Sequence, residues 1–130
     1  MLNNATLKDN ASAVAPTGGT DIVFQETGGS ITNGAQFQVT ADSDFRTRRI
    51  LNAKNRPSVY TNGSYSKAKR EVTIIQPEII DGAVVFNLIR ISTEVHPLTP
   101  AAREFNLRML GGQVLSDADF SGFWTTGSLS

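Results

Sequence analysis

Two segments of the chain alternate polar and apolar residues, and this alternation constrains the fold more than any other feature. In the segment 67–76, positions 67, 69, 71 and 73 are Lys, Lys, Glu and Thr, whereas positions 72 and 74 are Val and Ile. In the segment 89–96, Ile, Ile, Thr and Val alternate with Arg, Ser, Glu and His. Because successive side chains of a strand point to opposite faces, each segment predicts a strand with one polar and one apolar face. An antiparallel sheet that is covered on one side only has this pattern.

The long strands of this sheet are separated by turn residues. Two strands are predicted at 46–55 and 65–76, with Asn62–Gly63 as the turn between them. A third strand is predicted at 83–95, and Asp81–Gly82 joins it to the second as a hairpin. The facing of the strand 46–55 stays open, because both of its parities mix basic and apolar residues.

The N-terminal part of the chain has weaker strand signals. A half-buried strand is predicted at 36–40, where Phe37 and Val39 alternate with polar residues after an Asn33–Gly34 turn. Before it, the pattern indicates only strand fragments and turns: fragments at 5–7 and 21–25, and turns at Pro16–Gly19 and Gly28–Gly29.

The hydrophobic period changes from two to that of a helix at the C-terminus. Thr99 is predicted to cap a helix whose first turn contains Pro100. Within that helix, Phe105 and Met109 follow Ala102 at helical spacing. The pair Gly111–Gly112 is predicted to end the helix.

A second, shorter helix is predicted to follow, with Ser116 as its cap and Gly127 at its end. Asp117 and Asp119 are favourably placed at its positive end, which explains them better than calcium binding does. Strands followed by helices predict an α+β fold. The predicted single domain, 1–130, consists of an N-terminal arm and hairpin (1–30), an antiparallel sheet (36–96) and two helices (99–126).

Two short helices are a thin cover for so wide a sheet. The apolar residues of the helices exceed what one subunit can bury, so we expect a second copy of the chain to complete the core. Pairing of the last long strand with its symmetry mate would also protect an exposed edge. The predicted dimer core consists of Phe105, Met109, Phe120, Phe123 and Trp124.

The charge of the chain is strongly polarised, although its formal net charge is zero. Eight of the twelve Lys and Arg residues lie between Arg46 and Arg70, a stretch without any Asp or Glu. On a sheet face, this stretch would form a positive surface that suits a polyanion, most simply nucleic acid. The alternative is an ordinary solvated basic surface.

Several classes of protein lack support in the sequence. The chain has no cysteine, which excludes disulfides and thiolate metal sites, and neither a signal peptide nor a membrane span is expected. No phosphate loop, dinucleotide fingerprint or metal-ligand spacing is found, so no cofactor and no metal are predicted. His96, the only histidine, shares a strand face with Ser92 and Glu94, but three residues of one strand do not converge as a triad requires. No enzymatic activity is predicted.

Five segments together carry a family likeness. They are RRILNAKNRP (48–57), KREVTIIQPEI (69–79), VVFNLIRISTEVHP (84–97), HPLTPAAREFNLRML (96–110) and DADFSGFW (117–124). In this order, the last two thirds of the chain resemble coat proteins of the single-stranded RNA bacteriophages, the leviviruses. The connection 78–83 is shorter than in several members, and the segment 1–20 is longer than usual.

The resemblance implies both a fold and a function. The implied fold has an N-terminal β-hairpin, a five-stranded antiparallel sheet and two C-terminal helices, in an interlocked homodimer. Such dimers would assemble in the cytoplasm of the bacterial host into the icosahedral shell of a virion. The partners implied are other copies of the chain, viral genomic RNA, an RNA hairpin whose binding represses replicase translation, and a phage maturation protein.

The resemblance also assigns the RNA to the uncovered sheet face. Carried over by strand parity, the RNA-binding residues are Asn52, Lys54, Lys67, Lys69, Glu71, Thr73, Arg90 and Ser92. Lys and Arg would neutralise phosphates, whereas Asn, Ser and Thr would hydrogen-bond to bases. Tyr60 and Tyr65 either stack on bases or simply pack together at a hairpin end. A cellular RNA-binding regulatory module that forms no shell is the alternative function.

Overall fold

The computed structural model describes residues 9–10, 14, 19 and 21–129, with residues 28–30 described by their backbone only. Two compact units make up this part of the chain. The sheet unit ends at Pro97, and the helical unit contains residues 98–129 together with Asp9, Asn10 and Val14. The predicted strand fragment at 5–7 lies outside the described residues.

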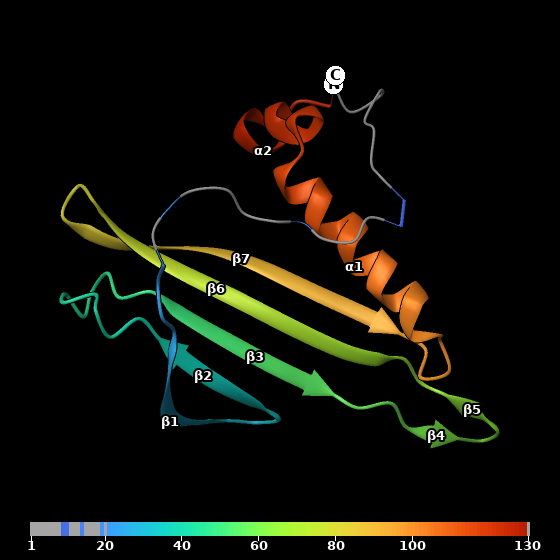
Figure 1. Ribbon diagram of the computed structural model, residues 1–130. Coiled ribbons are helices and arrows are strands. Elements are labelled where there is room, and N and C mark those ends of the chain that lie inside the picture. Colours follow the sequence, from blue (N-terminus) through green and yellow to red (C-terminus); the bar gives the residue numbers. More distant parts are fainter. Residues whose placement is uncertain (1–8, 11–13, 15–18, 20, 130) are drawn as a thin grey trace. The chain divides into compact units, whose positions relative to one another are not determined.

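The sheet unit contains a five-stranded antiparallel sheet, as the sequence predicts (Figure 1). Its strand order is β1-β2-β3-β6-β7. The strands are β1 (Gln25–Ile31), β2 (Gly34–Gln38), β3 (Ile50–Arg56), β6 (Ala68–Ile80) and β7 (Ala83–Val95). A separate two-stranded hairpin, β4 (Tyr60–Thr61) with β5 (Ser64–Tyr65), lies between β3 and β6 in the chain.

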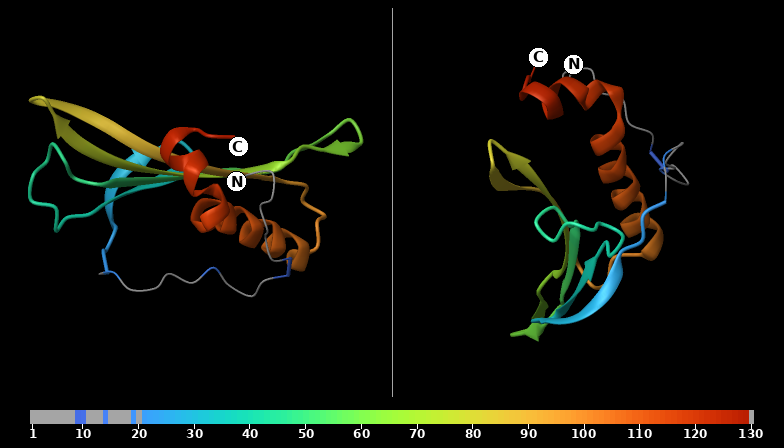
Figure 2. Two further views of the ribbon diagram at one scale, coloured as in Figure 1. Left: turned by 90° about the horizontal axis from the view of Figure 1, so that it is seen from above. Right: turned by 90° about the vertical axis from the view of Figure 1, so that its left-hand side faces the viewer.

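Turn chemistry accounts for the hairpins. Asn62 and Gly63 have φ values of 51° and 80°, and Asp81 and Gly82 have values of 52° and 79°. Two consecutive positive φ values define the two-residue turn whose twist matches that of antiparallel strands. The β4–β5 and β6–β7 turns therefore lie where the sequence predicts them. Figure 2 shows the β4–β5 hairpin at one end of the sheet and the β6–β7 turn at the other.

Several strand and turn predictions were wrong in their limits. The predicted fragment 21–25 contributes only its last residue to β1, and the predicted strand 36–40 corresponds to β2, which runs from Gly34 to Gln38. The predicted strand 46–55 begins only at Ile50, because residues 40–49 form a loop. The predicted strand 65–76 is interrupted, since β5 ends at Tyr65 and β6 begins at Ala68. Gly28–Gly29 is not a turn but lies within β1, where the register shifts between Glu26 and Ser30 as in a β-bulge.

Both helices differ from their predicted limits as well. Helix α1 (Ala101–Ser116) runs through Gly111–Gly112 instead of ending there, and its N-cap residue is Pro100 without a side-chain cap. Asp117 rather than Ser116 caps the next element, because its carboxylate accepts a hydrogen bond of 2.9 Å from the backbone of Asp119.

The second helical region is split into two short elements. They are the 3₁₀ helix η2 (Ala118–Phe120) and helix α2 (Ser121–Thr126). Gly127 ends α2 in the left-handed conformation, as predicted. The indole Nε1 of Trp124 donates a hydrogen bond of 2.9 Å to the carbonyl of Val114, which ties α2 to α1.

The described chain has almost no core of its own. Val39, which is 1% exposed, is the only buried hydrophobic residue among the described residues, and no residue of α1 or α2 is buried. None of the described helices is long and apolar enough to cross a membrane. A chain of 130 residues is long enough to enclose a core, so its apolar side chains require a further surface to cover them.

Candidate nucleic-acid interface

The strand register divides the sheet into two chemically distinct faces. One face carries Ala35, Phe37, Leu51, Ala53, Val72, Ile74, Ile89 and Ile91, which we call the apolar face. A polar row, Asn55, Arg70 and Thr93, lies at one end of it. The opposite face carries Gln36, Gln38, Asn52, Lys54, Arg56, Lys69, Glu71, Thr73, Arg90, Ser92 and Glu94, which we call the polar face. It also carries one apolar row, Ile50, Ile75 and Leu88, which continues the row of Gln38. The register also resolves the facing of β3, which the sequence left open.

The polar face is a grid of three rows across β3, β6 and β7. Asn52 lies opposite Thr73, which lies opposite Arg90. The second row joins Lys54, Glu71 and Ser92, and the third joins Arg56, Lys69 and Glu94. Seven of the eight residues assigned to RNA from the sequence therefore lie in this grid. The eighth, Lys67, is exposed and precedes β6, outside any strand.

Positive charge on this face is only partly neutralised. The Nε atom of Arg90 lies 3.6 Å from a carboxylate oxygen of Glu71. Arg90 therefore lies opposite Thr73 and beside Glu71, and not opposite Lys69, which pairs with Glu94. Within the described part of the chain, no ion pair involves Lys54, Arg56 or Lys69.

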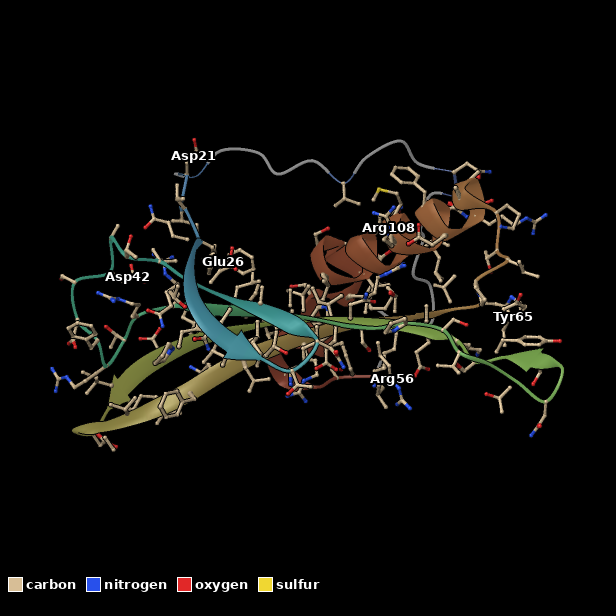
Figure 3. The ribbon with its side chains drawn as sticks, turned by 90° about the horizontal axis from the view of Figure 1, so that it is seen from below. Asp21, Glu26, Asp42, Arg56, Tyr65 and Arg108 are labelled. Carbon is tan, nitrogen blue, oxygen red and sulfur yellow. The ribbon has the colours of Figure 1, made fainter. Side chains whose placement is uncertain are left out.

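The unpaired cations surround a hollow at the edge of the grid. Its volume is about 320 Å³, and it lies between the β1–β2 turn and the ends of β3 and β6. The hollow is lined by Thr32, Asn33, Lys54, Asn55, Arg56, Lys69 and Glu71. Figure 3 shows Arg56 between Asp42 and Tyr65, which lie toward opposite ends of the sheet unit. Ammonium, guanidinium, amide and hydroxyl donors in one hollow can neutralise and hydrogen-bond a phosphate group.

One polar atom in the grid has no hydrogen-bond partner. The side-chain oxygen Oδ1 of Asn52 is buried and accepts no hydrogen bond in the described structure. Its neighbour Thr73 is also buried, with 8% of its surface exposed. An unsatisfied buried acceptor costs about 1–3 kcal/mol, so it marks a place where an external donor would be bound favourably.

The sequence reasoning missed part of this face. Arg56 belongs to the hollow, and Gln36 lies opposite Asn52 in β2. Arg56 follows Lys54 by two residues, so the alternation of β3 was the signal that could have identified it. Gln36 was recognised as a polar strand residue, but only the register places it beside Asn52.

The remaining candidates lie elsewhere in the sheet unit. The rings of Tyr60 and Tyr65 pack at 4.8 Å between centroids, and the ring of His96 meets Tyr65 edge-on at 5.8 Å. His96 follows the end of β7, whereas Ser92 and Glu94 lie within it. In the described residues no cluster of His, Asp and Glu suits a metal ion.

The residues assigned to a dimer core are incompletely covered in the single chain. Phe105 is 38% exposed and Trp124 is 51% exposed. Met109, Phe120 and Phe123 are half-buried, and the rings of Phe123 and Trp124 pack at 5.0 Å between centroids.

Comparison with known proteins places this fold in a family. No protein-family model matches the chain, and no curated protein matches it. Among solved structures, the chain is similar to the "Virus-like particle of bacteriophage GQ-907", with 42% identity over 100% of both chains and a TM-score of 0.95. It also shares its fold with the "Virus-like particle of Beihai levi-like virus 21", with 16% identity over 89% of this chain and 93% of the other, and a TM-score of 0.63. Full-length similarity at this identity, together with the sheet and the two C-terminal helices, shows that the chain belongs to the coat-protein family of the single-stranded RNA bacteriophages, the leviviruses.

Proposed function

We propose that this chain is the structural protein of a phage capsid, and that its dimers assemble into an icosahedral shell around genomic RNA. The observation that carries the proposal is the full-length similarity to a chain of a virus-like particle. The nearly absent core supports it independently, because a chain with one buried hydrophobic residue among those described needs partner surfaces for its apolar side chains. The protein would then be a virion component, assembled in the bacterial cytoplasm, where it also meets the maturation protein.

We further propose that the polar face binds the RNA. The cations Lys54, Arg56 and Lys69 are free to neutralise phosphates, and this part of the binding would be insensitive to sequence and sensitive to salt. Asn52, Thr73 and Ser92 are side by side or one row apart, and they can hydrogen-bond to unpaired bases of a hairpin loop. Preference for one hairpin would allow the dimer to repress replicase translation.

Replacing two lysines tests the role of this face. We expect the Lys67→Ala, Lys69→Ala protein to bind every RNA more weakly and to lose roughly 0.7–0.9 log units of salt-dependence slope for each phosphate contact removed. Filter binding over a salt series and the RNA content of purified particles measure both effects. Arg103→Ala on α1 is the matched control, since it removes an exposed cation outside the sheet unit.

Two results would contradict the proposal in different ways. Double-variant particles that hold as much RNA as the parent, with an unchanged salt slope, would show that this face does not meet the genome. RNA binding by a soluble dimer that never forms particles would favour a regulatory RNA-binding module over a capsid protein.

A further inference from the structure

The loop between β2 and β3, residues 40–49, contains several hydrogen bonds between its own charged residues. The carboxylate of Asp42 accepts hydrogen bonds from the backbone N, Nε and Nη2 of Arg49, at 3.1, 2.9 and 2.9 Å. Asp44 accepts from the same three groups of Arg46, at 2.9, 3.3 and 3.1 Å. The Nε of Arg48 donates to the carbonyl of Asp42 at 3.1 Å. These bonds favour one conformation of the loop within a single chain.

This loop presents an aromatic ring to the outside. Phe45 is 83% exposed, and the guanidinium carbon of Arg48 lies 4.4 Å from the ring centroid. A large aromatic side chain on a pre-ordered loop loses little conformational entropy on binding, which is the property of an interface anchor. We call residues 40–49 the Phe45 loop.

The β6–β7 hairpin offers an apolar surface at the same end of the sheet. The last pair between β3 and β6 is Ile50 with Ile75, so residues 76–80 pair only with residues 83–87. We call this projection the β6–β7 arm; Figure 1 shows it extending beside the Phe45 loop. Its exposed apolar residues are Ile79, Ile80, Val85 and Phe86, of which Phe86 is 65% exposed.

The two projections have complementary charge. The arm carries Glu78 and Asp81, and no Lys or Arg occurs between Glu71 and Ile89. The Phe45 loop carries three Arg and two Asp residues. Because two of the Arg residues are neutralised by Asp, the guanidinium of Arg48 beside the ring is the charge that remains.

We propose that the Phe45 loop of one copy binds the β6–β7 arm of a neighbouring copy, with Arg48 directed to the carboxylates of the arm. The inference rests on the proposed function, because it supplies a contact between dimers of a shell. A loop that contacts a different surface on the next copy is a heterologous interface, and such interfaces close into rings when the rotation permits. Rings around symmetry axes are the contacts that an icosahedral shell needs.

RNA is a poorer partner for the Phe45 loop. Arg46 and Arg49 are held in pairs by Asp44 and Asp42, so the loop offers a phosphate backbone only one uncompensated cation, Arg48. The two Asp residues would also lie close to the backbone of a nucleotide stacked on the ring. The apolar, acidic β6–β7 arm is the better partner, because it needs only one cation and places an apolar surface against the ring.

Cysteine pairing tests the contact directly, because the chain contains no cysteine. Tagged Phe45→Cys dimers are mixed with untagged Phe86→Cys dimers, and disulfide formation is followed before and after assembly. We expect tagged–untagged disulfides only in assembled particles, since the pairing is between dimers. Val59→Cys replaces Phe86→Cys in the control, because Val59 is equally accessible at 59% exposure but precedes the hairpin at the opposite end of the sheet. Equal cross-linking of Phe45→Cys to either cysteine would overturn the proposal.

A substitution of the anchor provides the second measurement. We expect Phe45→Asp to form dimers of normal thermal stability but to need at least a tenfold higher concentration for assembly, while Phe45→Leu assembles nearly as the parent does. Particles of Phe45→Asp at the parent's threshold concentration would overturn the proposal, and so would normal particles that have only lost RNA. Failure of the unsubstituted chain to form particles would instead contradict the proposed function.

Discussion

Asn52 holds a buried polar atom of the polar face. Polar residues of a solvated face satisfy their hydrogen bonds with water or with neighbours. The Oδ1 atom of Asn52 is buried and has no partner in the described structure, although Thr73 and Gln36 are its cross-strand neighbours. A base with a suitably placed donor would relieve this cost, and we propose that Asn52 discriminates between hairpins in this way.

Replacement of Asn52 by Ala tests whether this residue contributes to RNA recognition or to the stability of the fold. Because the substitution removes an acceptor that makes no hydrogen bond in the described structure, we expect Asn52→Ala to leave the free energy of unfolding unchanged or to raise it by up to about 1–3 kcal/mol. The affinity difference between a preferred hairpin and a random one should shrink, with the salt slope unchanged. Urea unfolding and competition binding measure the two effects. Strong destabilisation with unaltered discrimination would show that Asn52 is purely structural.

Asp42 determines how the Phe45 loop responds to pH. The hydrogen bonds from the Arg49 side chain, followed by the one from the Arg49 backbone, lower the pKa of Asp42 from 3.8 to about 2. A depressed pKa in the folded state stabilises the fold above the ordinary pKa, and this contribution is lost as the pH falls through the folded value. The loop should therefore keep its structure at every pH above about 4.

The matched variant is Asp42→Asn. We expect its melting temperature to lie below that of the parent above about pH 4, and the two values to converge as the pH approaches about 2. Thermal unfolding followed by circular dichroism over this range gives the comparison. A constant difference down to pH 2 would mean that the carboxylate charge of Asp42 is not what orders the loop.

At the scale of elements, the alternation of polar and apolar residues predicted the long strands correctly, whereas the glycine pairs did not predict where elements end. The polar face could be read from residues 67–76 and 89–96, because strand parity depends only on local spacing. The structure of the Phe45 loop could not be predicted in this way. Asp42 pairs with Arg49 and Asp44 pairs with Arg46, and sequence spacing does not define this geometry. The pairing of Arg90 with Thr73 likewise depends on the register between β6 and β7, which sequence spacing does not define.

The helix glycines show how packing overrides local propensity. Gly111–Gly112 costs α1 roughly 1 kcal/mol per residue relative to Ala, and that cost suggested a helix end. An added Cβ on Gly112 would lie 3.2 Å from Cγ2 of Val14, so the missing side chain leaves space for the N-terminal segment. Helix α1 continues to Ser116 in spite of this cost.

Replacement of glycine by alanine is expected to have opposite effects on stability at Gly34 and at Gly111. A Cβ at Gly34 would overlap the carbonyl oxygen of Ala53 in β3, so we expect Gly34→Ala to destabilise the sheet by roughly 1–3 kcal/mol. Nothing lies within 4 Å of a Cβ at Gly111, and Gly111→Ala should stabilise α1 by about 0.5–1 kcal/mol. Chemical denaturation measures both. Loss of assembly in a well-folded Gly111→Ala protein would instead show that this helix surface is covered by a partner.

The scarcity of buried residues is the dominant property of the whole molecule. Val39 is the only buried hydrophobic residue among the described residues, while Phe105 and Trp124 stay partly exposed. Burial of an aromatic side chain against a second subunit would supply the missing hydrophobic stabilisation.

Truncation of the helix aromatics tests this dependence. We expect Trp124→Ala or Phe105→Ala to cost about 3–5 kcal/mol of dimer stability, to prevent assembly and to reduce soluble expression. Leu129→Ala is the control, because this residue is 73% exposed and lies beyond the end of α2. Concentration-dependent thermal unfolding distinguishes a weakened dimer from a damaged subunit. If the Trp124→Ala protein assembled at the same concentration as the parent, Trp124 would not belong to the dimer interface.

Electron microscopy of the unsubstituted chain, purified after expression in bacteria and treated with nuclease, tests the capsid function most directly. Size-exclusion chromatography beforehand separates assembled from unassembled protein. We expect uniform closed particles that contain nuclease-protected RNA, with dimers as the smallest folded species after disassembly. A stable, folded monomer at micromolar concentration, without particles and without bound RNA, would contradict it.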